Sequence, residues 1–211
     1  MVRTDLALEA KESVSEKEAG IHGVNVDEKY NPDTDIRVTN VSIDTKNAAR
    51  VLGKPMGRYI TIEAPNMVEP DEDTPDDESH REVSIHLSAA LKKLIPNFHK
   101  EQSILVIGLG NRDVTADALG PHVVDNLFVT RHVVKAYGKA AFQDGLVNLI
   151  SCVEPGVTAR TGMDAAEIIK GVTEQTKPDA VVVIDALAAR SVKRLNRTIQ
   201  ITNTGIQPGS G

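Results

Sequence analysis

The sequence predicts an α/β fold in three layers, α/β/α, built around a mainly parallel sheet. Aromatic residues make up only 3% of the chain and Trp is absent. The core therefore has to consist of Val, Ile, Leu and Ala, as in parallel sheets that are buried on both faces. From residue 104 onward, apolar runs alternate with helical patterns, which indicates right-handed crossover connections. A chain of 211 residues is long enough for one full-sized core and a small satellite.

Residues 1–100 are less regular, and we expect them to form a smaller region that packs on the core. A short amphipathic stretch is followed by a polar tract rich in Glu and Lys. Two runs of alternating apolar residues then predict strands at 36–43 and 57–63, with a helix between them at 47–52. This pattern fits a small strand pair, either a βαβ unit or a hairpin-like one.

An acidic stretch lies between Val68 and Arg81 and is interrupted by two prolines. We interpret it as a solvated loop that leads into a helix, because it lacks the Gly and the alternating ligands of a calcium-binding EF-hand loop. A cation site is the alternative interpretation. The apolar spacing at 83–94 predicts an amphipathic helix, with Pro96 just beyond its end.

Residues 101–211 form the predicted catalytic α/β core. The chain ends in loop residues that normally lead into another element, so we expect this core to be truncated at its carboxyl end. The strands of its parallel sheet are predicted at 104–107, 146–150, 180–184 and 198–202, with helices at 121–134 and 163–176.

Three carboxylates fall at the carboxyl ends of these strands, where the loops of an open parallel sheet converge on ligands: Asp117, Glu154 and Asp185. Two neighbouring carboxylates can share a proton, so that one activates a water molecule while the other protonates an oxygen or a leaving group. Asp117 and Asp185 are therefore candidates for acid/base hydrolysis. Capping is the alternative role, in the helix at 121–134 for Asp117 and in a turn at 186–190 for Asp185.

Several other functions are disfavoured by the sequence. The net charge is −6 and Lys and Arg are scattered, so direct nucleic-acid binding is not expected. No apolar stretch approaches the length of a membrane span, and no apolar segment of a signal peptide follows Met1. We therefore expect no membrane association and a cytoplasmic location.

Nucleotide, metal and thiol chemistry also lack a matching pattern. The loop Gly108-Leu109-Gly110-Asn111-Arg112-Asp113 has Asp113 where a dinucleotide-binding loop has its third glycine. The lone Cys152 lies in an apolar run, where a core role is favoured over a nucleophile. The histidines are dispersed without the spacing of metal ligands, at 22, 80, 86, 99, 122 and 132. We expect neither a metal nor a cofactor.

Five motifs together resemble the spore germination protease family, and the resemblance covers essentially the whole chain. They are VRTDLALEA at 2–10, GLGN at 108–111, VTADALGP at 114–121, IDALAARS at 184–191 and TGIQPGSG at 204–211.

The resemblance implies an atypical aspartic endopeptidase of endospore-forming bacteria, with the catalytic aspartates at Asp117 and Asp185. It implies a protein made as a zymogen, active as a homotetramer in the spore core, that digests small acid-soluble proteins coating spore DNA at germination. The family shares its fold with hydrogenase maturation proteases, whose corresponding acids bind nickel. A metal-dependent peptidase of that type and a non-catalytic binding module are the alternative functions.

The chain departs from the family's pattern at several points. Ala116 stands where Pro is usual, and Glu154 stands where a small apolar residue is usual. We expect Glu154 to add negative charge near the two aspartates. Little prosegment precedes the first motif, so the chain is similar to the processed form or to an abbreviated precursor, and the family's carboxyl-terminal half is absent.

Overall fold

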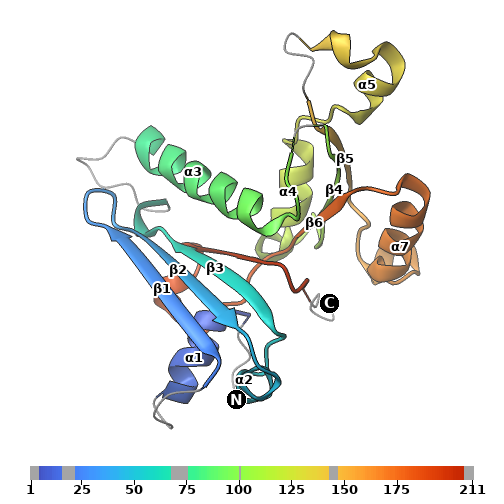
Figure 1. The fold of residues 1–211 in the computed structure, drawn as a ribbon. Helices are drawn as coiled ribbons and strands as arrows, with labels where there is room; N and C mark the ends of the chain where they lie inside the picture. Colours follow the sequence, from blue (N-terminus) through green and yellow to red (C-terminus); the bar gives the residue numbers. More distant parts are fainter. Residues whose placement is uncertain (1–4, 16–21, 68–75, 100, 143–146, 207–211) are drawn as a thin grey trace. The chain divides into compact units, whose positions relative to one another are not determined.

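The computed structural model describes residues 5–15, 22–67, 76–99, 101–142 and 147–206 (Figure 1). The contacts divide the chain into two compact units. One comprises Met1–Ile95 with Leu187–Gly205, and the other comprises Pro96–Ala186 with the chain end. The elements are α1 (Ala7–Ser15), β1 (Val24–Asn31), β2 (Ile36–Ile43), α2 (Lys46–Leu52), β3 (Gly57–Glu63), α3 (Asp76–Leu94), β4 (Ser103–Gly108), α4 (Leu119–Asp125), α5 (Arg131–Tyr137), β5 (Leu149–Val153), α6 (Thr158–Thr161), α7 (Ala165–Thr176), β6 (Ala180–Ile184) and β7 (Thr198–Thr202).

The first unit is built on an antiparallel sheet with the strand order β1-β2-β3-β7. Ala7 of α1 and Leu52 of α2 pack on one face of this sheet, against Val41 and Tyr59. Helix α3 covers the opposite face, where its Val83 packs with apolar residues of β2 and β3 (Figure 1). Helices therefore cover both faces of this sheet.

The second unit is built on a parallel sheet with the order β5-β4-β6. The central strand β4 is buried from Ile104 to its end. Its Leu105 and Ile107 pack with Ile169 and Val172 of α7, whereas Gly108 approaches Gly120 of α4. The fold is thus α/β, as predicted, with a parallel sheet in this unit.

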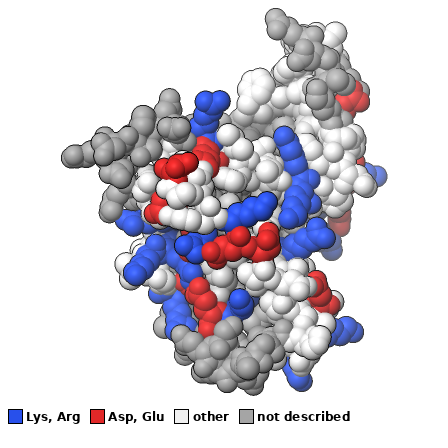
Figure 2. All heavy atoms as spheres, turned by 60° about the vertical axis from the view of Figure 1, so that its left-hand side comes forward, with Lys and Arg blue, Asp and Glu red and all other residues white. Residues whose placement is uncertain are grey.

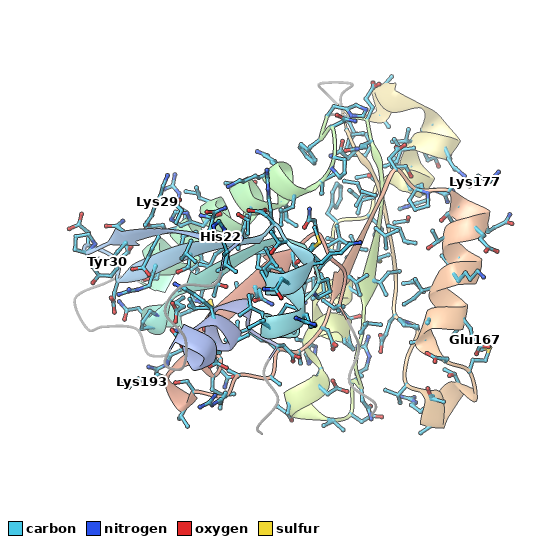
Figure 3. All side chains as sticks on the ribbon, turned by 60° about the horizontal axis from the view of Figure 1, so that its bottom comes forward. His22, Lys29, Tyr30, Glu167, Lys177 and Lys193 are labelled. Carbon is cyan, nitrogen blue, oxygen red and sulfur yellow. The ribbon has the colours of Figure 1, made fainter. Side chains whose placement is uncertain are left out.

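Helix α7 shows how the sequence sets the ends of an element. Asp164 caps its start in a capping box with Glu167, and Lys177 ends it in a left-handed conformation. Figure 3 shows Glu167 and Lys177 at the two ends of this helix. Strand β6, which follows α7, pairs in parallel with β4, and Gly108 of β4 lies opposite Ile184 of β6.

One predicted strand pairs differently from expectation, so the prediction of a parallel sheet is correct for β4, β5 and β6 and wrong for β7. Strand β7 was expected to be the fourth strand of the parallel sheet, but it pairs antiparallel with β3. The reason lies in its alternation: Ile199 and Ile201 face the apolar cluster under α3, while polar residues between them face away. Such alternation is typical of antiparallel strands, whereas parallel strands read as continuous apolar runs.

Two further differences concern the elements themselves. Strand β1 was not predicted, because its residues are mostly polar and exposed and alternate only weakly. It forms by pairing with β2 along the full strand. The single helix predicted at 121–134 is instead two helices, α4 and α5, because Thr130 between them bonds to the backbone of β5.

Parts of three motifs lie outside the described residues: 2–4 at the amino end, 68–75 of the acidic stretch with its alternative cation site, and 207–211 at the carboxyl end. The division into a region of residues 1–100 and a core of 101–211 stays a prediction about domains. In the structure, the contacts group residues 187–205 with the N-terminal strands.

Candidate functional site

The loop that follows β4 is held by close contact between backbone segments. Gly110 has a φ of +118°, and a Cβ at this position would overlap the carbonyl oxygen of Asp117. A Cβ on Gly120 would overlap the carbonyl oxygen of Leu109. Only glycine allows such an approach and such a φ. The two glycines thus fix how the loop returns to α4, and they explain the glycine motif without a nucleotide.

Asp117 is half-buried in a short 3₁₀ turn at Thr115–Asp117. The backbone N–H of Asn111 donates to Asp117 Oδ2 at 2.8 Å and to its carbonyl oxygen at 3.1 Å. The loop is closed by two more bonds, from Val114 N to the Asn111 oxygen and from Asp117 N to the Val114 oxygen. Helix α4 has Ala118 as its N-cap, without a side-chain bond. The capping alternative for Asp117 is therefore wrong.

Asp185 is half-buried and comes directly after β6. Its Oδ1 accepts a hydrogen bond from the N–H of Ala186 at 2.9 Å, and no helix is formed at 186–190. The N–H of Leu109 donates to the carbonyl oxygen of Ile184 at 2.8 Å, which continues the parallel pairing to the end of β6. The residue next to Asp185 is thus bonded to the loop that carries Asp117.

Asp117 and Asp185 consequently belong to the same edge of the parallel sheet. They follow the adjacent strands β4 and β6, and the turn Leu109-Gly110-Asn111 contacts the surroundings of both. Two carboxylates at such an edge are suited to acid/base chemistry on a bound substrate. Asp185 directly follows β6, whereas Asp117 lies later in the loop between β4 and α4, and the catalytic role of both residues stays a prediction.

Glu154 follows β5, which lies on the other side of β4 from β6. Its carboxylate pairs with the guanidinium of Arg112 in the loop after β4, and Arg112 also binds Asp125 of α4 through both of its terminal nitrogens. Arg112 thus pairs with two carboxylates and offsets only one of their two negative charges. We call Arg112, Asp125 and Glu154 the Arg112 cluster.

The bonds of the Arg112 cluster shift the pKa values of Asp125 and Arg112. The hydrogen bonds from Arg112 lower the pKa of Asp125 below its usual value. The same bonds, to Asp125 first and to Glu154 second, raise the pKa of Arg112. Sequence reasoning singled out Glu154 and missed Arg112, Asp125 and Asn111. The position of Arg112 directly after the glycine turn was the signal available.

A comparison with known proteins identifies the family. The sequence matches that of germination proteases over residues 2–211. The chain belongs to the germination protease family. The resemblance read from the five motifs is thereby confirmed, and the chain comes from a family of proteases that act in spore germination.

Several curated members of the germination protease family are similar to the whole of this chain. The protein of Caldanaerobacter subterraneus subsp. tengcongensis is 47% identical over 210 residues, which are 61% of its length. That of Clostridium perfringens is 45% identical over 211 residues, 62% of its length, and that of Bacillus subtilis is 45% identical over 219 residues, 56% of its length. The chain spans about three fifths of the length of these relatives.

The cysteine and two of the histidines considered from the sequence lie outside the loop that carries Asp117. Cys152 is half-buried in β5, and burial followed by the negative charge of Asp125 raises the pKa of its thiol. A raised pKa keeps the thiol protonated and weakens it as a nucleophile. His122 and His132, expected on one helix, lie on α4 and α5.

Three features of the described residues bear on metal, membrane and nucleic-acid binding. No three His, Cys, Asp or Glu side chains of the described residues gather in a way that could hold a metal ion. Among the described helices, none has the length and apolar character needed to span a bilayer. Basic and acidic side chains are interleaved on the face shown in Figure 2.

Proposed function

We propose that this chain is part of an aspartic-type endopeptidase that hydrolyses small acid-soluble spore proteins during germination. Asp117 and Asp185 act in this proposal as general acid and general base around one water molecule. The observation that carries it is the position of both half-buried carboxylates at one edge of the parallel sheet, after adjacent strands. Membership of the germination protease family supplies the reaction class.

The chemistry follows from the surroundings of the two carboxylates. The Asn111 N–H donates to one oxygen of Asp117 and leaves the other oxygen of this carboxylate for a water molecule or a substrate. One carboxylate takes a proton from the attacking water, and its protonated partner donates a proton to the scissile carbonyl oxygen or to the leaving amine. Atoms balance because the water supplies both the hydroxyl of the new acid and the proton of the new amine.

The proposal extends to the complete protein. We expect it to be made as a zymogen, to act as a homotetramer and to reside in the cytoplasm of the spore core, with unfolded spore proteins as substrates and without nucleic acid or membrane as a partner. A three-layer core related to that of hydrogenase maturation proteases fits the helices on both faces of the parallel sheet, and the proposed chemistry needs neither a cofactor nor a metal.

Replacement of each aspartate in the complete protein tests the mechanism. Asp117→Asn and Asp185→Asn keep the side-chain shape but remove the ionisable group, so each is expected to lower kcat by about 100-fold or more. Asp113→Asn is the matched control, because Asp113 lies in the same loop, is exposed and pairs with Arg160. The measurement is cleavage of a purified small acid-soluble spore protein. Near-normal turnover in either of the first two variants would contradict the acid/base pair.

The unaltered protein and the Asp117→Asn variant also test the alternative of a metal-dependent peptidase. Calorimetric titration with Ni²⁺ and Zn²⁺, together with activity after treatment with a chelator, is expected to show no saturable binding at the site and no loss of turnover. Saturable binding that disappears in Asp117→Asn, accompanied by loss of activity in the chelator, would replace the proposed mechanism with a metal-dependent one.

A further inference from the structure

The Arg112 cluster joins three elements of the parallel unit at its carboxyl edge. Arg112 lies in the loop after β4, Asp125 is the last residue of α4, and Glu154 directly follows β5. Both terminal nitrogens of Arg112 bind Asp125, the Nη2–Oδ1 distance being 3.1 Å, and Nη2 also binds Glu154. One guanidinium thereby connects the loop to the neighbouring helix and to the neighbouring strand.

This arrangement uses the geometry of arginine. The guanidinium is planar and presents several N–H donors in fixed directions, so that it can bind two carboxylates at once. Because the two acids belong to different elements, Arg112 has little freedom to change its backbone direction while both pairs are formed. A lysine in its place has a single ammonium group on a flexible stem and holds the two acids less rigidly.

The residue beside Arg112 is the one that contacts Asp117. The backbone N–H of Asn111 donates to Asp117 Oδ2 at 2.8 Å, and the carbonyl oxygen of Asn111 accepts from Val114. The Asn111 N–H lies in the Gly110–Asn111 peptide, and the Asn111 carbonyl lies in the next peptide, which it shares with Arg112. The two peptides are joined only through the backbone torsions of Asn111, so Arg112 restrains the N–H by limiting these torsions. The orientation of the Asp117 carboxylate therefore depends on the backbone that Arg112 holds.

We propose that Arg112 is a positioning residue for the peptidase reaction, which holds the Asn111 peptide in place through Asp125 and Glu154 and thereby orients the carboxylate of Asp117. This inference rests on the proposed catalytic role of Asp117. Arg112 acts through the loop and does not touch the substrate in this role. Small displacements of a catalytic group lower turnover strongly, whereas they affect binding of the remainder of the substrate far less.

A neighbouring arginine provides a matched control. Arg160 pairs with Asp113 of the same loop at 3.1 Å, and both side chains are well exposed, at 62% and 73%. Arg160 lies in α6 and therefore brings a comparable charge to the same loop, but it pairs there with only one carboxylate. If a general loss of charge at this edge were responsible for an effect of Arg112, Arg160 would show it as well.

The kinetic test uses the complete protein. Arg112→Ala is expected to lower kcat by about 10-fold or more while KM changes less than about twofold. Arg112→Lys and Glu154→Gln are expected to have smaller losses of kcat, and Arg160→Ala to match the unaltered protein. If Arg112→Ala does not fold, the kcat of Glu154→Gln still tests the proposal, because this variant removes the charge of one partner of Arg112. Addition of guanidinium ion at millimolar concentration is expected to restore part of the kcat of Arg112→Ala. Equal losses in Arg112→Ala and Arg160→Ala, or a change confined to KM, would overturn the proposal.

A second measurement follows the Asn111 amide directly and needs no turnover. Its N–H is bonded to Asp117, so its hydrogen exchange is slow as long as the loop is held. Exchange is expected to be about 10-fold faster in Arg112→Ala and unchanged in Arg160→Ala. Unchanged exchange in Arg112→Ala would overturn the positioning role. A fully active Asp117→Asn variant would instead overturn the proposed function, so the two failures are distinguishable.

Discussion

The two units hold their functional segments by different means. In the parallel unit, the loop after β4 is held by backbone against backbone, at Gly110 and Gly120. In the antiparallel unit, side chains do this work: the carboxylate of Glu9 is 4% exposed and accepts the backbone N–H groups of Arg190 and Ser191, each at 2.9 Å. Close contact of glycine backbone, with the Arg112 cluster beside it, holds the first segment, whereas carboxylate bonds to backbone N–H groups hold the second.

Two further residues of the antiparallel unit, Asp5 and Arg194, also hold the chain through side-chain hydrogen bonds. The N–H of Ala188 donates to Asp5 Oδ2 at 3.1 Å, and the N–H of Asp5 donates to the Ala188 oxygen. Arg194 is largely buried and bonds to both Glu12 and Glu63. Substitutions should therefore lower the stability of the two units for different reasons. In the parallel unit an added Cβ overlaps the backbone, and in the antiparallel unit a removed side chain takes its hydrogen bonds with it.

The largest expected effect is in the parallel unit. Gly120→Ala places a Cβ against the backbone of Leu109, which is too rigid to yield cheaply, so the free energy of unfolding should fall by about 3 kcal/mol or more. Asp117 should also move, because its loop returns through this contact. Urea unfolding of the complete protein measures the first effect, and cleavage of a spore-protein substrate measures the second.

Gly171→Ala is the matched control for this substitution. Gly171 is also a helical glycine, in α7, but apart from its chain neighbours and the backbone of its own helix, no described atom lies within 4 Å of the position of a Cβ. The change to alanine should therefore raise the free energy of unfolding by about 0.5–1 kcal/mol, because alanine favours a helix. If both alanine variants had the same stability, backbone contact would not be what holds the loop.

An intermediate effect is expected in the antiparallel unit. Glu9→Ala removes a buried carboxylate and leaves the part-buried N–H groups of Arg190 and Ser191 without it, and we expect the free energy of unfolding to fall by about 2–3 kcal/mol. Hydrogen exchange at these two amides should become faster than at amides of β2. Urea unfolding and exchange, measured on the same protein, check both expectations.

Glu12→Ala is its control in the same helix. Glu12 pairs with Arg194 but its side chain is 51% exposed, so its loss should cost about 1 kcal/mol or less. Similar losses for Glu9→Ala and Glu12→Ala would mean that the ion pairs with Arg194, and not the bonds to the backbone, hold this segment.

The comparison also explains which features could be predicted from sequence. Strands β2, β3 and β6 were predicted with their bounds, because alternation or a continuous apolar run is a local signal. The backbone contacts at Gly110 and Gly120 appeared as a glycine motif, and the two aspartates were found because they follow apolar strands.

Features that depend on distant residues could not be predicted. Glu9 and Ser191 are 182 positions apart, and nothing in either local pattern indicates their bond. The antiparallel pairing of β7 with β3 joins residues that lie far apart in the sequence, such as Glu63 and Thr198. Arg112 was missed because its role follows from where Asp125 and Glu154 lie in space.

Leaving the control variants aside, the smallest expected loss of stability concerns Thr130, a side chain that also holds part of the parallel unit. Thr130 is 2% exposed, its hydroxyl donates to the Asn148 oxygen, and it accepts from the Ile150 N–H at 2.9 Å. Thr130→Val keeps the shape and removes both bonds, so the free energy of unfolding should fall by about 1–2 kcal/mol in urea unfolding. Thr130→Ser keeps the hydroxyl and should lose less than Thr130→Val. If Thr130→Val instead cost more than Gly120→Ala, side-chain bonds would outweigh backbone contact in the parallel unit as well, and the contrast between the two units would fail.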